Sequence, residues 1–217
     1  TYFGPIAERE ANPRIITREP EQRGERKFVH IGPNQPMYIE AYHTVRQLHE
    51  DSPALDILSD ILTRGRTSRL YQALVEDRGL AQQVQAFNGF PGDKYPALFL
   101  LYAIPRKGVE LNALVSALHQ ELDRIQEKGA TTEELDRAKT RLRADLVRGL
   151  KSNLGLARRL ARAEAQEGGW RSVFTYLDRL EKVDQNKIRQ VFKTYLVPEN
   201  RTLGRMLHQP PQEANPQ

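Results

Sequence analysis

Residues 54–87 read ALDILSDILTRGRTSRLYQALVEDRGLAQQVQAF and give the clearest indication of the fold. This stretch predicts a helix, a basic loop, a second helix and a strand in direct succession. Ser52 is a candidate N-cap for the first helix, and Pro53 suits the first helical position, where an N–H has no helical partner. The core-facing side of this helix is apolar at helical spacing: Leu55, Leu58, Ile61 and Leu62.

The second helix of this stretch is defined by residues at its two ends. Thr67 or Ser68 is placed to cap its start, and Gly79 is placed to end it in a left-handed conformation. Its predicted core face consists of Leu70, Ala73 and Leu74. The strand AQQVQAF follows at once, so that loop, helix and strand edge lie close together in the chain.

Several segments alternate apolar and polar side chains, which is typical of strands. The predicted strands cover residues 27–31, 37–43, 81–87, 97–104 and 201–207. Two of them, 81–87 and 97–104, are joined by NGFPGDKYP, which is rich in turn-forming residues.

The second half of the chain is dominated by helical periodicity. Apolar residues from Leu111 to Ile125 recur at helical spacing, and Gly129 is placed to close that helix. Thr131 and Glu134 form a candidate capping box for a long amphipathic helix. Its predicted stripe is Leu135, Ala138, Leu142, Leu146, Leu150 and Leu154, and Gly149 and Gly155 are positions where it would bend or break. Two further helices are predicted at 170–181 and 185–196.

The order of these elements predicts an α+β fold, with a largely antiparallel sheet and helices packed on one face. Residues 1–26 are rich in Pro, Glu and Arg and are interpreted as a connector arm. The domain is expected at 27–207, and the segment 208–217 is expected to be a disordered tail.

Composition excludes several classes of function. The chain of 217 residues carries 33 basic and 28 acidic residues, and this mild excess is spread along the chain rather than gathered into a dense basic stripe. It has no cysteine, so no disulfide, thiolate metal site or cysteine nucleophile is available. No stretch is apolar enough to span a membrane, so a soluble protein is expected. The chain opens without methionine or a signal peptide, which suggests a piece of a longer chain.

The motifs of common active sites are not found. Neither H-E-x-x-H nor H-x-x-E-H occurs, and the histidines are not paired on a helix, so no metal ligands are assigned. Ser68 has no histidine at a usable spacing and is better explained as a helix cap. The basic residues of the helical run 132–165 are mixed with acids and lack interleaved aromatics. They predict a solvated face, with nucleic-acid binding as an alternative.

Several segments together resemble the C-terminal half-domain of the M16 metallopeptidases, the group of pitrilysin, insulinase and mitochondrial processing peptidase. YFGPI and REPEQRGERKFV are similar to the connector, YIEAYHT to the first strand, and residues 54–87 to the signature helix–loop–helix–strand. TTEELDRAKTRLRADLV, LARRLARAEAQEGGW and YLVPENRTLGRML follow in family order. The resemblance covers nearly the whole chain. It rests on the order and spacing of these segments rather than on any one of them.

This resemblance implies a clam shell built from homologous half-domains. The N-terminal half carries H-x-x-E-H and the zinc, whereas the facing half closes the chamber and helps to hold an extended peptide. For this chain it therefore implies no cofactor and no catalytic residue, with zinc on the partner half. The implied partners are an N-terminal M16 half-domain, in the same parent chain or a separate subunit, and a peptide. A homodimer is a further possibility.

The resemblance also implies two positions that face the peptide, and both depart from the family pattern. Many relatives have an arginine within the second helix and a tyrosine at the start of the strand, where this chain has Val75 and Gln82. Valine cannot donate a hydrogen bond, and glutamine is not a phenol. Arg66, Arg69 and Gln82 are the candidate substrate-binding residues, and solvent exposure with helix contacts is the alternative for the two arginines.

The function implied is the non-catalytic half of a zinc peptidase that hydrolyses peptide bonds. The alternative is a catalytically inactive scaffold or assembly subunit. For the compartment, the resemblance makes the bacterial periplasm and the cytoplasm equally acceptable.

Overall fold

A computed structural model describes residues 19–92 and 94–208. The five strands are β1 (Arg26–Gly32), β2 (Met37–His43), β3 (Ala81–Phe90), β4 (Leu98–Pro105) and β5 (Arg201–His208). The helices are α1 (Ser52–Thr63), α2 (Arg69–Tyr71), η1 (Gln72–Asp77), α3 (Leu111–Lys128), α4 (Thr132–Leu150), α5 (Asn153–Gln166), α6 (Ser172–Glu181), α7 (Gln185–Tyr195) and η2 (Pro198–Asn200). Residues 1–18 of the predicted arm and 209–217 of the predicted tail lie outside the described residues, whereas Arg26 already belongs to β1 and His208 still belongs to β5.

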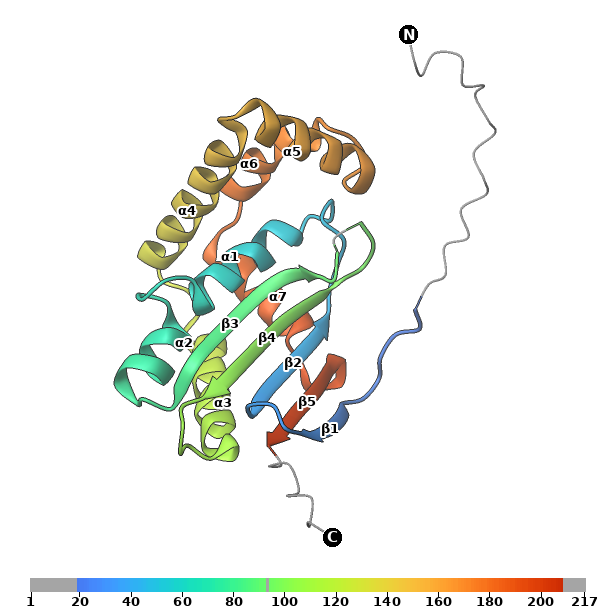
Figure 1. Ribbon diagram of the computed structural model, residues 1–217. Helices are drawn as coiled ribbons and strands as arrows, with labels where there is room; N and C mark the ends of the chain where they lie inside the picture. Colours follow the sequence, from blue (N-terminus) through green and yellow to red (C-terminus); the bar gives the residue numbers. More distant parts are fainter. Residues whose placement is uncertain (1–18, 93, 209–217) are drawn as a thin grey trace.

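The strands form one sheet in the order β1-β5-β2-β4-β3. The β1–β5 pair is parallel and the other three pairs are antiparallel. The helices gather on one side of this sheet (Figure 1). These observations confirm the predicted α+β fold, in which a largely antiparallel sheet carries its helices on one face.

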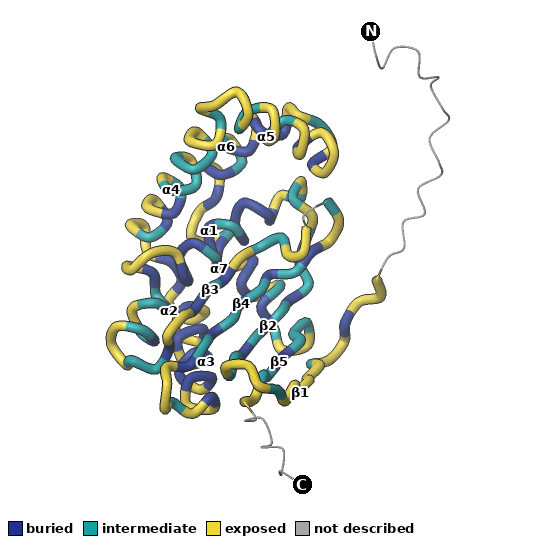
Figure 2. Tube along the Cα trace, in the orientation of Figure 1, coloured by how far each residue is buried: buried dark blue, intermediate teal, exposed yellow. Residues whose placement is uncertain are grey.

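Burial alternates along the central strands, as expected for a sheet covered on one face (Figure 2). In β2, Tyr38, Glu40 and Tyr42 are buried, while the residues between them are half-buried. β4 shows the same alternation, with Phe99 and Leu101 fully buried against the helices. The core therefore lies between the sheet and the helical layer.

Helix α1 is the most deeply buried helix and packs against β3, α4 and α7. Its predicted apolar face is confirmed, but the predicted cap is wrong. The helix begins at Ser52, and the N-cap position belongs to Asp51, whose side chain makes no capping bond. The Ser52 hydroxyl instead donates to Gln47 Oε1 at 3.0 Å. Ser52 is buried, and its hydroxyl is bonded to the loop that precedes α1.

The long amphipathic run is two helices rather than one. The capping box at its start is confirmed: the Thr131 hydroxyl accepts from the Glu134 N–H at 3.2 Å, and Glu134 accepts from the Thr131 N–H at 2.8 Å. The chain breaks between α4 and α5, in the interval bounded by Gly149 and Gly155. The predicted stripe is buried only near its start, and Leu154 is 61% exposed, because α5 turns away from the core.

Candidate functional site

The segment from α2 to β3 lies at one edge of the sheet, because β3 is the last strand in the sheet order. Gly79 adopts φ +60°, so the predicted left-handed end is confirmed. The helix before it differs from the prediction: a single α turn at Arg69–Tyr71 passes into a π-helical segment at Gln72–Asp77. Such π segments are frequent at functional sites. Leu70 and Leu74 are fully buried and anchor this segment to the core.

Arg69 does not project into an open groove. Its Nε donates to Glu134 Oε1 at 2.6 Å, and its Nη2 donates to Glu134 Oε2 at 2.6 Å and to the Gly129 carbonyl at 2.7 Å. The two side chains are only 20% and 14% exposed. The guanidinium therefore ties α2 to the start of α4, and its hydrogen-bonding capacity is largely used inside the fold.

The other candidate residues lie apart from this ion pair. Arg66 is exposed in the loop before α2. Val75 is half-buried and packs against the core. Gln82 is exposed, and its Oε1 accepts from Gln35 Nε2 at 2.8 Å. No hydrogen bond or ion pair joins Arg66, Arg69 and Gln82 to one another within the described part of the chain.

Gln82 occupies an irregular position in the β3–β4 ladder. Ala81 pairs with Pro105 and Gln83 pairs with Ile104, so Gln82 is the additional residue on β3. A bulge of this kind bends the strand and redirects a side chain. The start of β3 is therefore the part of the edge where a side chain is held out of the regular ladder.

The outer side of β3 is only partly free. The Ala86 N–H donates to the Thr63 hydroxyl at 2.8 Å, so this backbone group points away from β4 and is occupied by α1. Asn88 is bonded to the same helix, through Nδ2 to Asp56 Oδ1 at 3.0 Å. Because backbone directions alternate along an antiparallel strand, the N–H and C=O of Val84 point to the same outer side. Val84 is only 1% exposed, however, so an added strand would have to pair at the start of β3, where Gln82 and Gln83 are exposed.

The residues that the structure describes do not form a site that fits a zinc ion. No group of three or more metal-ligating side chains occurs among residues 19–92 and 94–208. Histidines approach carboxylates at three separate places: His43 near Glu19, His49 near Asp51, and His119 near Glu40. Catalytic zinc sites need three protein ligands at one point, and each of these places offers one histidine and one carboxylate.

Comparison with known proteins decides the family. A model of the family described as the Peptidase M16 inactive domain matches residues 1–142. The chain belongs to the M16 peptidase inactive-domain family. The match contains the α1-to-β3 segment that first indicated the fold, and the family description agrees with a chain whose described residues hold no zinc ligands.

Relatives of this M16 inactive domain carry protease names. An uncharacterized zinc protease of Streptomyces coelicolor is 32% identical over 143 residues, covering 66% of this chain and 30% of the relative. The zinc protease PqqE of Helicobacter pylori is 30% identical over 149 residues, covering 68% of this chain and 33% of the relative. The chain thus spans about a third of the length of these curated relatives.

Solved structures confirm the fold. The inactive peptidase domain of a putative zinc protease from Bordetella parapertussis superimposes with a TM-score of 0.74 at 27% identity, covering 84% of this chain and 96% of that chain. A protease from Helicobacter pylori gives a TM-score of 0.82 at 24% identity, covering 92% and 48%. Within the described part of this M16 inactive domain, no helix combines the length and apolar character needed to cross a bilayer.

One polar cluster in the core of the M16 inactive domain was not foreseen. Glu40 is fully buried and accepts from the hydroxyls of Tyr38 at 2.6 Å and Tyr42 at 2.7 Å, and it also contacts His119. Burial alone would raise the pKa of Glu40, but the bonds from His119, Tyr38 and Tyr42 hold the pKa below its ordinary value. The sequence signal for this cluster was Glu40 itself, a charged residue at a core-facing position of β2.

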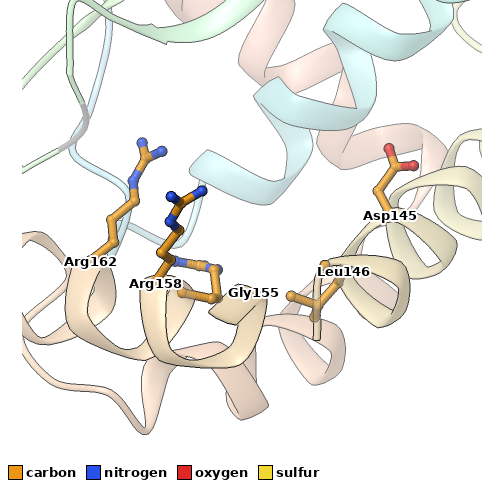
Figure 3. A pocket seen from close by; sticks show the side chains of 7 residues that line it. Asp145, Leu146, Gly155, Arg158 and Arg162 are labelled. Carbon is orange, nitrogen blue, oxygen red and sulfur yellow. The ribbon is translucent and has the colours of Figure 1, made fainter. Parts of the chain in front are cut away.

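A hollow at the α4–α5 corner was also not predicted from the sequence. Arg158 and Arg162 line it (Figure 3), and both are exposed, in agreement with the solvated helical face predicted for this run. The available signals were the two glycines that bracket the corner and the four-residue spacing of the arginines, which places them on one side of a helix.

Proposed function

We propose that this chain is the non-catalytic half of a zinc peptidase and forms the wall of a peptide chamber. In this proposal an N-terminal half-domain carries the zinc, and the present chain contributes backbone and side-chain contacts to an extended peptide. The family match and the protease relatives support the proposal, and the whole enzyme's activity and substrate are part of what is proposed.

The observation that carries the proposal is the start of the β3 edge, where the bulged Gln82 and the neighbouring Gln83 are exposed. An extended peptide can pair with such an edge through backbone hydrogen bonds, which suits the binding of varied sequences. The same edge is occupied by α1 at Ala86. The proposed contact is therefore short, and Gln82 rather than Arg69 is the side chain available beside it.

The alternative is a scaffold subunit without a role in hydrolysis. Arg69 favours it, because this arginine is committed to Glu134 and Gly129. Val75 favours it too, because it packs against the core where many relatives have an arginine. We regard peptide contact as the better proposal, since Gln82 and Gln83 at the start of β3 are exposed.

The test is reconstitution with the zinc-bearing half of the parent protein. Hydrolysis of a quenched fluorescent peptide is measured for that half alone, for this chain alone and for the mixture. The proposal expects cleavage in the mixture only, and a lower kcat/KM when Gln82→Ala is used. A zinc-loaded mixture that forms a complex but cleaves no peptide, beside a full-length parent that also cleaves none, would support the scaffold instead.

A further inference from the structure

The described end of the predicted connector, residues 19–25, lies outside the helices and strands and leads directly into β1 at the edge of the sheet (Figure 1). Gln22 in this segment is only 8% exposed, although glutamine is mostly a surface residue. Segments near the start of a domain are poorly ordered unless something ties them down. The contacts of residues 19–25 therefore decide whether the connector moves with the domain.

Gln22 is bonded to β5 through both ends of its amide. Its Nε2 donates to the Arg201 carbonyl at 2.8 Å and to the Gly24 carbonyl at 3.0 Å, so both hydrogens of this nitrogen are used. Its Oε1 accepts from the Thr202 hydroxyl at 3.2 Å. The amide is thus held in one orientation against the start of β5.

Glu25 adds an ion pair to the same strand. Arg201 Nε donates to Glu25 Oε2 at 2.8 Å, and Arg201 Nη2 contacts the same oxygen. The two side chains are only 18% and 20% exposed, so the pair is partly withdrawn from solvent. The other oxygen of Glu25 lies 2.6 Å from Lys27 Nζ. Charge-assisted bonds of this kind are among the stronger hydrogen bonds in proteins.

Arg201 connects this ion pair to the core. Its Nη1 lies 3.5 Å from Oε1 of the fully buried Glu40. Glu40 is itself fixed by the hydroxyls of Tyr38 and Tyr42. Because each member of such a network restricts the others, the position of Glu25 is set by the core of the domain.

Apolar burial contributes little to this attachment. β1 is exposed at every position except the half-buried Gly32, and Phe28 and Val29 are 54% and 57% exposed. The strand pairs with β5 alone in the described sheet. Hydrophobic stabilisation scales with the apolar area removed from water, so the polar bonds of Gln22 and Glu25 carry much of the attachment.

We propose that Gln22, Glu25 and Arg201 form a clamp that makes residues 19–25 a rigid extension of this domain. The connector clamp, as we call it, fixes the direction from which the preceding chain arrives. What that chain carries rests on the proposed function. A zinc-bearing half would be held in one orientation at this boundary, where a free hinge would let it swing.

Limited proteolysis of the 217-residue chain tests the connector clamp without the zinc half. Trypsin cuts after the exposed Arg23 only when the backbone around it opens, and the rate follows the population of the open form. Gln22→Ala with Glu25→Ala should raise the rate of this cut about tenfold. Cutting after Arg66, in the exposed loop before α2, is the internal reference and should not change.

Arg205→Gln is the matched control on the same strand. Arg205 Nη1 donates to Asn112 Oδ1 at 2.7 Å, on α3 rather than on the connector. This variant should leave the rate of cutting after Arg23 within about twofold of the wild-type rate. Equal acceleration by Arg205→Gln, or equal acceleration after Arg66 in the clamp variant, would indicate general loosening and overturn the inference.

A distance measurement gives a second readout that needs no cleavage. Because the chain has no cysteine, Arg23→Cys with Asp123→Cys provides two unique positions for nitroxide labels, one on the connector and one on the exposed side of α3. Pulsed electron paramagnetic resonance should give a narrow distance distribution, which broadens when Gln22→Ala and Glu25→Ala are added. Circular dichroism confirms that each variant is folded.

A broad distribution in the labelled chain with Gln22 and Glu25 intact would overturn the connector clamp. Both measurements use this chain alone, so their result is separate from the cleavage test. A narrow distribution in a chain that adds nothing to peptide cleavage would overturn the proposed function and leave the connector clamp in place.

Discussion

Arg69 and Glu134 form a two-pronged ion pair, with Nε–Oε1 and Nη2–Oε2 distances of 2.6 Å each. Arg69 begins α2, and Glu134 completes the capping box of α4. Burial would raise the pKa of Glu134, but the bonds from Arg69 and from the Thr131 N–H hold it below its ordinary value. The pair joins two helix starts that are far apart in the sequence.

Removing Arg69 should therefore destabilise the fold rather than act on peptide binding alone. Arg69→Ala leaves Glu134 and the Gly129 carbonyl without a shared donor, and we expect the free energy of unfolding to fall by about 2 kcal/mol. Arg66→Ala, in the exposed loop, is the control and should change it by less than about 0.5 kcal/mol. Urea denaturation followed by circular dichroism measures both variants, and equal values would contradict a structural role for Arg69.

Local signals in the sequence predicted the fold well. Gly79 was expected to adopt a left-handed conformation because it follows a helical pattern, and Thr131 with Glu134 was expected to cap a helix. Each of these features depends on residues only a few positions away, so the local sequence is enough to predict it. The apolar faces of α1 and α3 were equally clear, because burial follows their periodicity.

The candidate site was harder to predict, because its residues are placed by contacts between distant segments. Nothing near Arg69 in the sequence indicates that Glu134 will approach it. The π-helical turn at Gln72–Asp77 follows from how Leu70 and Leu74 reach the core, which helix propensity does not describe. The position of Arg158 similarly depends on a close approach between two glycines, Gly149 and Gly155.

Substitution by alanine at the two glycines of the α4–α5 corner should change the stability of the fold in opposite directions. Gly155→Ala places a methyl group against the Gly149 carbonyl, so we expect a loss of about 1 to 3 kcal/mol in stability. Nothing lies within 4 Å of a Cβ on Gly149, so Gly149→Ala should be neutral or stabilising by up to about 1 kcal/mol. Thermal unfolding of both variants checks this, and a stable Gly155→Ala would mean that the corner is looser than described.

The hydroxyl of Tyr42 should contribute more to the free energy of unfolding than the hydroxyl of Tyr102. Tyr42→Phe removes one donor from the buried carboxylate of Glu40, and we expect a cost of about 1 to 3 kcal/mol. The Tyr102 hydroxyl accepts only from the exposed Gln83 amide at 2.9 Å, so Tyr102→Phe should cost less than about 0.5 kcal/mol. Chemical denaturation of the two variants makes the comparison, and similar losses would show that the Glu40 cluster does not depend on Tyr42.

Glu40 should also make stability depend on pH in the acidic range. Its folded pKa is lowered, so its contribution is complete above the unfolded pKa of about 4.3 and is lost as pH falls through the folded value. The stability difference between the wild type and Glu40→Gln should therefore shrink as the solution is acidified below that unfolded pKa. Glu76→Gln, on the exposed side of η1, is the control. The stability difference between this variant and the wild type should stay small at every pH. A constant Glu40→Gln difference would contradict this account.

Hydrogen exchange at β3 can locate the proposed peptide contact. The Ala86 N–H is bonded to Thr63, which is 3% exposed, so its exchange should be slow whether or not a peptide is present. The Val84 N–H points to the same side, and Val84 is 1% exposed, so its exchange should also be slow in both states. The bulged Gln82 is exposed, and exchange of its amide should slow when a peptide pairs with the edge. Thr63→Val removes the acceptor for Ala86, so the Ala86 amide should exchange faster and stability should fall by about 1 to 2 kcal/mol. If a saturating peptide protects Ala86 in the wild type, or leaves Gln82 unprotected, the peptide does not pair with β3 as proposed. Peptide contact would then have to come from side chains elsewhere on the chain.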